Sequence, residues 1–557
     1  MKLLAVVFLV HLLASSVLAQ GSKTTPTPKQ DQCRVAGMVV KLAGSEPLRK
    51  TKVTLQSEDD RTRTVAVVTD AGGRFELKGL DPGRYRLRAS RLGYVTSEYG
   101  QRKPEDPGAV LTLRPGQEMK DLQFRLIPSA VIAGRILDED GEPLPRVNVS
   151  ALREVYAKGK RSLSTWATAE TNDLGEYRLF ALAPGRYFVS AVFPHWNRFG
   201  NTDTAEDPTA DPQGYTKMYY PGTPDPAKAS SFSIKSGEEI PSVEILMRQV
   251  LVYRIRGHVY NQITHKPGAG TNIILTAKNQ DREWDAGFQQ VNIQKQDGSF
   301  EIPEVMPGSY ALGAYWYDEG KFYSTTTSVD VGNADVEGIA VTIAPGVVIN
   351  GQILWEGKPS LEKDELTVMP MAVDLDIMFH GRARVDAGNF FTLKDMGEGT
   401  YHPRVEGQSK DCYIKDVRYA GSSVLEDGFT VTRGAAGSLE ITISAHGAIV
   451  QGNVTDADGL PAAGVWAVLV PSAPGRSQNR LYKTQTTDQY GHFILKGIAP
   501  GDYQLFSWDE VEQGAWEDAD FLKRFEEKGE KVTVEEGDSK AVNLTTIRTA
   551  STEQQKP

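Results

Sequence analysis

One short motif recurs five times along the chain and constrains its fold more than any other feature. It reads GRFELKGLDPGRYRL at residues 73–87, and its variants are GEYRLFALAPGRYFV, GSFEIPEVMPGSYAL, GNFFTLKDMGEGTYHP and GHFILKGIAPGDYQL. Apolar residues alternate on both sides of a Pro-Gly pair, which is the pattern of two half-buried strands joined by a turn. We therefore interpret the motif as a structural hairpin corner. In the first copy it is formed by Phe75, Pro82, Gly83 and Tyr85.

The spacing of the motif predicts a string of whole domains. Its tyrosines lie roughly 100 residues apart, which is the size of a small domain and too long for a solenoid repeat. Each copy also opens with a glycine followed by an alternating strand, and shows short strands without helical periodicity. We predict an all-β chain of five tandem antiparallel β-sandwich domains, arranged as a rod. The five motif tyrosines are Tyr85, Tyr187, Tyr310, Tyr401 and Tyr503.

The positions of the motif tyrosines also predict the domain boundaries. The expected segments are a signal peptide at 1–19, a linker at 20–32, sandwiches at 33–128, 129–249, 250–345, 346–445 and 446–548, and a disordered tail at 549–557. The fourth sandwich is divergent: Glu398 replaces the motif proline, and an extra residue is expected between Phe390 and Tyr401. One short helix is predicted in the last sandwich, from Trp516 to Gly529, with Asp518 as its cap.

The N-terminus predicts export. MKLLAVVFLVHLLASSVLAQ has a charged start and an apolar run, with a cut expected after Ala19. A retained anchor is the alternative, but the run is shorter than the ~20 residues that a span requires. We expect a protein without a membrane span, in the periplasm or outside the cell. Cys33 and Cys412 are expected to be free thiols, since a bridge between them requires the first and fourth domains to touch.

Composition and motifs point away from several kinds of chemistry. The net charge is −10 and no basic block is present, so nucleic acid is not an expected partner. The histidines lack zinc-site spacing, and no nucleophile-elbow, phosphate-loop or dinucleotide motif occurs. We expect no catalytic residues, no metal and no cofactor. The acidic turns at 138–140 and 456–458 could either bind calcium or form Asx turns.

Aromatic residues in the second copy form the most specific candidate for ligand binding. A long insertion there carries Trp196, Arg198, Tyr215, Tyr219 and Tyr220. These residues could stack on and hydrogen-bond to sugar rings, or they could simply cover a sandwich edge. The third copy offers a second aromatic cluster, some members of which must be core because the pattern alternates. Its residues are Tyr315, Trp316, Tyr317, Phe322 and Tyr323.

The repeats resemble a known family. GRILDEDGEPLPRVNV and TNDLGEYRLFALAPGRYFV in copy two, TDAGGRFELKGLDPGRYRL in copy one, and GNVTDADGLPAAGVWAVL with TTDQYGHFILKGIAPGDYQL in copy five are similar to the carboxypeptidase regulatory-like domain. Copies three and four keep mainly the aromatic core of the motif. The resemblance implies a small transthyretin-like sandwich, grouped with carbohydrate-binding-like folds, that is non-catalytic and exported by bacteria. It is specific for fold and poorly specific for function.

Two functional hypotheses follow. The first is an exported, non-catalytic protein that acts as an extracellular scaffold, spacer or adhesion module and contacts another cell-surface protein. The second is an extracellular polysaccharide-binding protein that uses the aromatic insertion of the second copy.

Overall fold

The computed structural model describes residues 32–549 except 61, 105, 158, 194–212, 279–287, 319–320, 359–360, 362–364, 374–380, 435–436 and 474. The predicted signal peptide, most of the linker and residues 550–557 lie outside the described residues. The fold is almost entirely β, and its sheets form five tandem sandwiches, which confirms the predicted fold class. The exact residue boundaries of the domains stay a prediction.

We number the sandwiches 1 to 5 by their strands. Sandwich 1 pairs β4(Arg74–Leu80), β1(Cys33–Lys41) and β8(Glu118–Leu126) in one sheet, and β3(Thr64–Val68), β2(Lys52–Ser57), β5(Gly83–Ser90), β6(Ser97–Glu98) and β7(Leu111–Leu113) in the other. Sandwich 2 pairs β12(Glu176–Leu182), β9(Ala130–Leu137) and β17(Glu239–Leu246), and opposite them β11(Lys160–Glu170), β10(Asn148–Ala157), β13(Gly185–Val192), β15(Met218–Tyr219) and β16(Phe232–Ile234), with β14(Gln213–Tyr215) on β18(Gln249–Leu251) beside them.

Sandwiches 3 and 4 repeat this plan. Sandwich 3 consists of β20(Lys266–Pro267), β19(Tyr253–Asn261), β23(Ser299–Val305) and β26(Val336–Ile343), opposite β22(Phe288–Asn292), β21(Asn272–Ala277), β24(Gly308–Asp318) and β25(Lys321–Val331). Sandwich 4 consists of β30(Phe390–Met396), β27(Val347–Glu356), β35(Leu439–Ser444), β32(Tyr413–Tyr419) and β33(Ser422–Ser423), opposite β29(Ala383–Arg384), β28(Thr367–Ala372), β31(Gly399–Glu406) and β34(Phe429–Val431).

Sandwich 5 adds short helices to the same plan. Its sheets are β39(His492–Ile498), β36(Ala448–Thr455), β42(Ser539–Ala541) and β43(Leu544–Thr545), and β38(Lys483–Thr486), β37(Trp466–Pro471), β40(Gly501–Ser507) and β41(Glu530–Val534). The single helix predicted over residues 516–529 is wrong in extent. The chain forms the 3-10 turn Ala515–Glu517, α1(Ala519–Lys523) and a second 3-10 turn, Glu526–Lys528, although Asp518 does cap α1 by accepting from the Phe521 amide at 2.8 Å. Among the described residues, further 3-10 turns are Pro226–Lys228, Gly475–Ser477 and Asn479–Leu481.

The opening glycine of each copy marks a pairing that the sequence did not reveal. The first strand of every sandwich runs antiparallel to the first motif strand and parallel to the closing strand of the same sandwich, as in β1 with β4 and β8. A Cβ built on Gly37 would lie 2.1 Å from the Leu122 carbonyl oxygen, and one on Gly257 would lie 2.1 Å from that of Ile339. Only glycine leaves room for this close approach of two backbones.

The motif forms the same corner in all five sandwiches. The hydroxyl of Tyr85 donates to the Asp81 carbonyl four residues back at 2.7 Å, and Tyr503 does the same to Ala499 at 2.8 Å. Tyr187, Tyr310 and Tyr401 repeat the bond at 3.0, 2.8 and 3.0 Å. Pro82 starts the turn, and Gly83 follows at φ 157°. Each ring spans its turn, and its polar tip satisfies a turn carbonyl that would otherwise lack a partner.

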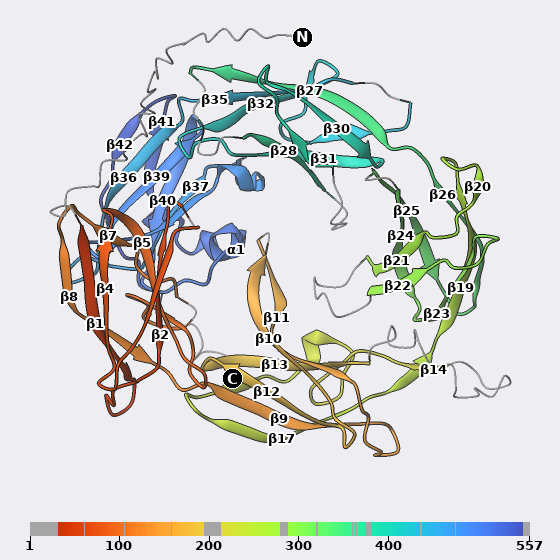
Figure 1. Ribbon diagram of the computed structural model, residues 1–557, viewed down its shortest axis with the longest axis horizontal. Coiled ribbons are helices and arrows are strands. Elements are labelled where there is room, and N and C mark those ends of the chain that lie inside the picture. The colour runs from red at the N-terminus through yellow and green to blue at the C-terminus, as the bar shows by residue number, and fades with distance from the viewer. Residues whose placement is uncertain are drawn as a thin grey trace, which may run out of the picture.

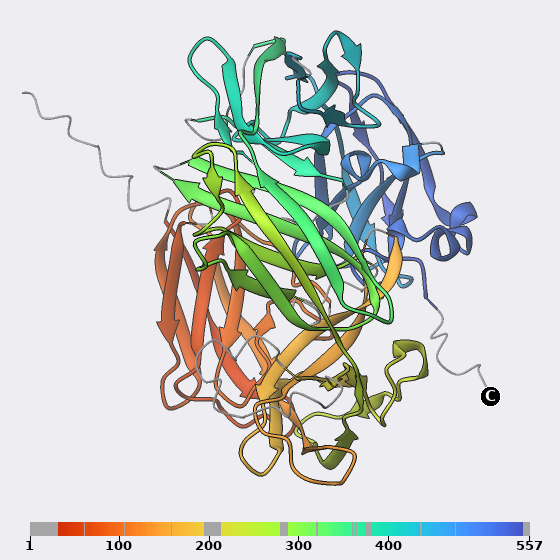
Figure 2. The same ribbon diagram turned by 90° about the vertical axis from the view of Figure 1, so that its right-hand side faces the viewer.

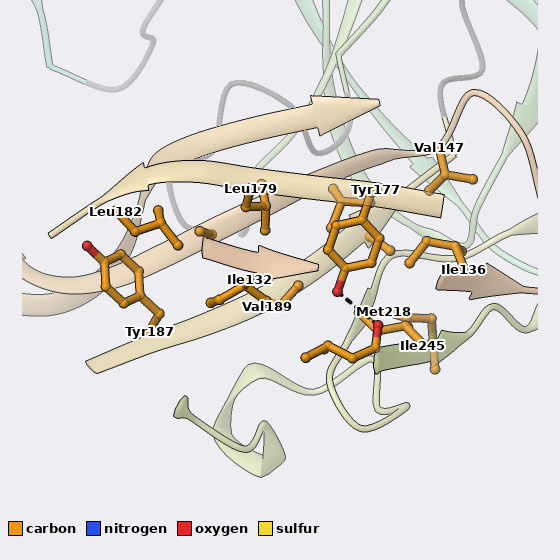
Figure 3. Packing of buried hydrophobic residues seen from close by; sticks show 14 of the residues in the cluster. Ile132, Ile136, Val147, Tyr177, Leu179, Leu182, Tyr187, Val189, Met218 and Ile245 are labelled. Carbon is orange, nitrogen blue, oxygen red and sulfur yellow. Dashed lines mark hydrogen bonds between the residues drawn. The ribbon is translucent and has the colours of Figure 1, made fainter. Parts of the chain in front are cut away.

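Burial assigns the motif positions to the core. Figure 3 shows the core of sandwich 2, in which Tyr177 and Tyr187 enter from the two motif strands and pack with aliphatic side chains from both sheets. Phe75 is buried in sandwich 1 in the same way. In sandwich 4 the buried phenylalanine of the first motif strand is Phe391, which lies opposite Gly351 in the strand pairing, as Phe75 lies opposite Gly37 in sandwich 1. The prediction of an extra residue in this copy is therefore wrong. Phe391 rather than Phe390 occupies the core position, and the spacing from Phe391 to Tyr401 equals that from Phe75 to Tyr85.

The five sandwiches form a closed ring, so the predicted rod is wrong. Figure 1 shows sandwich 5, drawn in blue, beside sandwich 1, drawn in red, and Figure 2 shows sandwich 3 in front with sandwich 4 above it and sandwich 2 below. The Val110 amide donates to the Thr487 carbonyl at 3.3 Å. Two reciprocal bonds join Thr112 to the Gln489 side chain at 2.9 and 2.8 Å.

An arginine of the motif itself holds this closure. The sequence suggests that Arg86 faces solvent, because this position varies among the copies. Instead, its guanidinium donates to Glu58 at 2.6 Å, to Glu98 at 3.2 Å and to the Gly108 carbonyl at 2.9 Å. It also crosses to sandwich 5, where Thr486 accepts at 2.8 Å. This motif position, which varies between copies, thus joins sandwich 1 to sandwich 5.

Two further contacts complete the ring. The β10–β11 hairpin extends into the middle of the ring toward α1 (Figure 1), and the rings of Tyr156 and Phe521 lie 6.4 Å apart. Between sandwiches 4 and 5, Glu536 accepts from the Tyr413 hydroxyl at 3.1 Å and from Lys415 at 3.2 Å. The hydrogen bond from Ser444 is the main reason that the pKa of Glu536 lies below its ordinary value. The hydrogen bonds from Lys415 and Tyr413 and the charge of Lys415 lower this pKa further.

The termini and thiols differ in part from expectation. Thr549, the predicted start of the disordered tail, bonds through its amide to Asp509 at 3.0 Å. Cys33 and Cys412 are both buried and form no disulfide with each other, as predicted. Burial raises the pKa of the Cys412 thiol. Sandwiches 1 and 4 nevertheless approach each other, since Lys410 lies 3.8 Å from Asp59.

Candidate binding site between sandwiches 3 and 4

The β24–β25 hairpin of sandwich 3 sorts its aromatic residues onto two faces. Cross-strand pairing places Trp316 opposite Tyr323, and both rings pack on the core of sandwich 3. Tyr317 pairs with Phe322 on the other face. Tyr315 lies two residues before Tyr317 on β24 and therefore shares this face. The predicted division of this cluster into core and surface members therefore holds, because adjacent residues of a strand point to opposite faces.

This outer face forms one wall of a hollow. The rings of Tyr315 and Phe322 stack at 5.7 Å with an interplanar angle of 23°, and the Tyr315 hydroxyl accepts from Gln290 at 2.8 Å. Tyr317 is 67% exposed, a large value for an aromatic side chain. The wall is thus a fixed aromatic surface with one open ring.

Sandwich 4 supplies the other wall. Asp386 accepts from the amides of Gly388 and Phe390 at 2.8 and 2.9 Å, which forms a tight turn before β30. Asn389 occupies this turn at φ 66°, where asparagine is tolerated better than most residues. The turn leaves the Phe390 ring 54% exposed while Phe391 enters the core. Contacts between β25 and β30 bring the two walls together.

The hollow between the walls has a volume of about 970 Å³. It is lined by Tyr315, Tyr317, Phe322, Gly381, Arg382, Ala383, Arg384, Asp386, Phe390, Phe391, Thr392, Lys394 and Asp395. This volume lies near the upper end of the range for small-molecule sites, roughly 300–1,000 Å³. It combines apolar ring faces with charged groups, which suits a ligand that has both an apolar face and many polar atoms.

Charges on the sandwich 4 wall are partly paired. Arg382 donates to Glu406 at 3.1 Å, and Arg384 lies 2.8 Å from Glu365. All four side chains are substantially solvent-accessible, so these pairs orient the guanidinium groups and contribute little to stability. The wall therefore presents oriented hydrogen-bond donors to the hollow.

The predicted site in the second copy lies elsewhere, and its described tyrosines are packed. Trp196 and Arg198 lie outside the described residues. The Tyr215 ring lies 5.4 Å from Phe193, and Tyr219 is buried at 8% exposure. Tyr220 packs on Phe232 with ring centroids 4.7 Å apart. These three tyrosines rest against sandwich 2, and the polysaccharide site proposed for the insertion stays a prediction.

The acidic turns behave as Asx turns. Asp138 accepts from the amides of Asp140 and Glu142 at 3.0 and 2.8 Å, and Asp456 makes the same pair of bonds. Among the described residues, no group of three or more His, Cys, Asp or Glu side chains is placed to hold a metal ion. Within the same residues no helix has the length and apolar character of a membrane span.

Comparison with known proteins supports the resemblance for part of the chain. Residues 34–126 and 131–208 match the sequence model of the carboxypeptidase regulatory-like domain, so two tandem segments, at sandwich 1 and in sandwich 2, are similar to this domain. No curated protein matches the chain.

Solved structures resemble the chain only distantly. The TIE protein of Bacillus anthracis is 14% identical, with a TM-score of 0.15, and the match covers 56% of this chain and 50% of that protein, so the chain spans half its length. The minor pilin of Streptococcus agalactiae is 12% identical over 39% of this chain and 96% of the pilin, with a TM-score of 0.22. The major pilin subunit of Bacillus cereus is 12% identical over 56% of this chain and 99% of that chain, with a TM-score of 0.14.

Proposed function

We propose that this chain, which begins its described part with two tandem segments similar to the carboxypeptidase regulatory-like domain, is an exported, non-catalytic scaffold that binds saccharide. The observation that carries the proposal is the hollow between sandwiches 3 and 4. It places exposed aromatic rings opposite oriented polar groups, and sugar rings combine apolar C–H faces with hydroxyl groups at their edges. The ring closure supports a scaffold, because it fixes the two walls in a compact assembly.

The closed ring of sandwiches narrows the first hypothesis from the sequence, which named a scaffold, a spacer or an adhesion module. A spacer needs an extended string of domains, whereas here the first and last sandwiches are hydrogen-bonded to each other. A compact ring serves better as a rigid platform for adhesion than as a spacer. The second hypothesis keeps its ligand class, and we place the binding site between sandwiches 3 and 4.

Binding to a glycan array tests the proposal. The mature protein should bind at least one oligosaccharide, and Tyr317→Ala and Phe390→Ala should each weaken that binding by about 2- to 10-fold, since an aromatic stacking contact contributes roughly 0.5–1.5 kcal/mol. Matched controls are Tyr260→Ala and Phe180→Ala, which remove rings of 45% and 60% exposure outside the hollow. Their binding should be unchanged.

Two results would overturn the proposal. Absence of binding to every glycan would remove the saccharide function, as would equal losses in the hollow and control variants. Release of a product from a bound glycan by the purified protein would remove the non-catalytic assignment.

A further inference from the structure

We infer that the ligand of the hollow is an acidic oligosaccharide, one that carries uronic-acid carboxylates. This inference rests on the proposed saccharide function and specifies its ligand class. It follows from the balance of hydrogen-bond donors and acceptors on the sandwich 4 wall. Aromatic rings alone do not distinguish acidic from neutral sugars, because both present the same C–H faces.

Among the described lining residues of this wall, three side chains are cationic and two are carboxylates. Arg382, Arg384 and Lys394 all line the hollow. An arginine carries five N–H donors and a lysine three. Each arginine contacts its carboxylate partner through a single Nη2 atom. Lys394 is exposed and makes no hydrogen bond or ion pair with any other residue that the structure describes.

Acidic groups of the same wall are largely engaged. One carboxylate oxygen of Asp386 is held by the amides of Gly388 and Phe390. Glu406 and Glu365, which pair with the two arginines, are not part of the lining. Within the part of the lining that the structure describes, Asp395 is the other carboxylate, and it can accept from a sugar hydroxyl. The described lining therefore offers more hydrogen-bond donors than acceptors, and a carboxylate is the sugar substituent that uses such donors best.

The size of the hollow indicates an oligosaccharide. Its volume of about 970 Å³ is well above the lower limit of roughly 300 Å³ for small-molecule sites. Aromatic rings occur on both walls, with Tyr317 on one and Phe390 on the other. Several linked sugar units can contact both walls at once, which a single unit does less well.

Paired ligands test the inference. An oligouronate should bind at least 10-fold more tightly than the same oligosaccharide with its carboxyls reduced to alcohols. Raising the salt concentration should weaken binding of the oligouronate and leave the reduced ligand unaffected, because screening acts only on the charged contacts. Titration calorimetry measures both affinities on the full mature chain.

Charge variants complete the experiment. Lys394→Gln should weaken oligouronate binding about 5-fold and leave the reduced ligand unaffected, and Arg382→Gln is a second variant of the same wall. Lys228→Gln, an exposed lysine of sandwich 2, is the matched control and should change neither affinity.

The outcomes separate this inference from the proposed function. Equal affinity for the two ligands, with a loss in Tyr317→Ala and none in Lys394→Gln, overturns the acidic ligand and preserves saccharide binding. Equal losses in Lys394→Gln and Lys228→Gln also overturn it, since the attraction is then nonspecific. Absence of binding to either ligand overturns the saccharide function as well.

Discussion

A substitution of Arg86 gives the sharpest test of how the ring of five sandwiches closes. Arg86→Met keeps the aliphatic stem and removes a guanidinium that makes four hydrogen bonds, one of them to Thr486 of sandwich 5. It also deprives Glu58 and Glu98 of a cation, and the side chains of these residues are only 27% and 18% exposed. A hydrogen bond to a charged group contributes about 1.5–3 kcal/mol.

Only part of this hydrogen-bond energy stabilises the junction between sandwiches 1 and 5. Three of the four bonds lie within sandwich 1, and Glu98 keeps its contact with Arg88 at 2.6 Å. After a discount for partial exposure, we expect the junction to lose about 2 kcal/mol, which is a roughly 30-fold larger open population. Hydrogen exchange at the Val110 and Thr112 amides, which donate across the junction, should accelerate by the same factor, since exchange follows the open population when reclosing is fast.

Arg88→Met is the matched control on the same strand. Arg88 also contacts Glu98, but it is 50% exposed, and this partner lies within sandwich 1. Exchange at the junction should change less than about threefold, as expected for a surface ion pair. Equal exchange at the junction in the two variants would refute the role of Arg86 in closing the ring.

Three further predictions concern the repeated elements and one junction. Tyr503→Phe should lower the stability of sandwich 5 by about 1 kcal/mol, measured by urea unfolding, because the Ala499 carbonyl loses its hydrogen bond. Gly257→Ala should destabilise sandwich 3 by about 3 kcal/mol, whereas Gly332→Ala, where an added Cβ meets nothing within 4 Å, should be nearly neutral; similar melting curves would contradict the close-approach argument. The folded-state pKa of Glu536 is depressed, so its contribution is complete above the unfolded value of 4.5 and is lost as pH falls through the folded pKa. Exchange at the junction of sandwiches 4 and 5 should therefore increase on acidification below pH 4.5, and Glu536→Gln should remove this pH dependence.

The sequence by itself determined the class of fold and the repeated corner. Alternation with period two, a Pro-Gly turn and a recurring tyrosine are local signals, and each depends on backbone geometry that neighbouring residues set. The spacing of the tyrosines then counted the sandwiches. The sequence also flagged an aromatic cluster that contains Tyr315 and Tyr317, although it did not assign which members are exposed and it favoured the insertion of the second copy as the binding site.

Only the tertiary structure decided how the sandwiches meet and where the candidate site lies. Arg86 varies among the copies and looks like a solvent-facing position, and its partner Thr486 is distant in sequence. The choice of Phe391 over Phe390 for the core required the register against Gly351. The hollow combines residues of two sandwiches, so no local pattern could place its walls opposite each other. Such contacts depend on the packing of whole domains, and the sequence of a single chain carries no periodic signal for them.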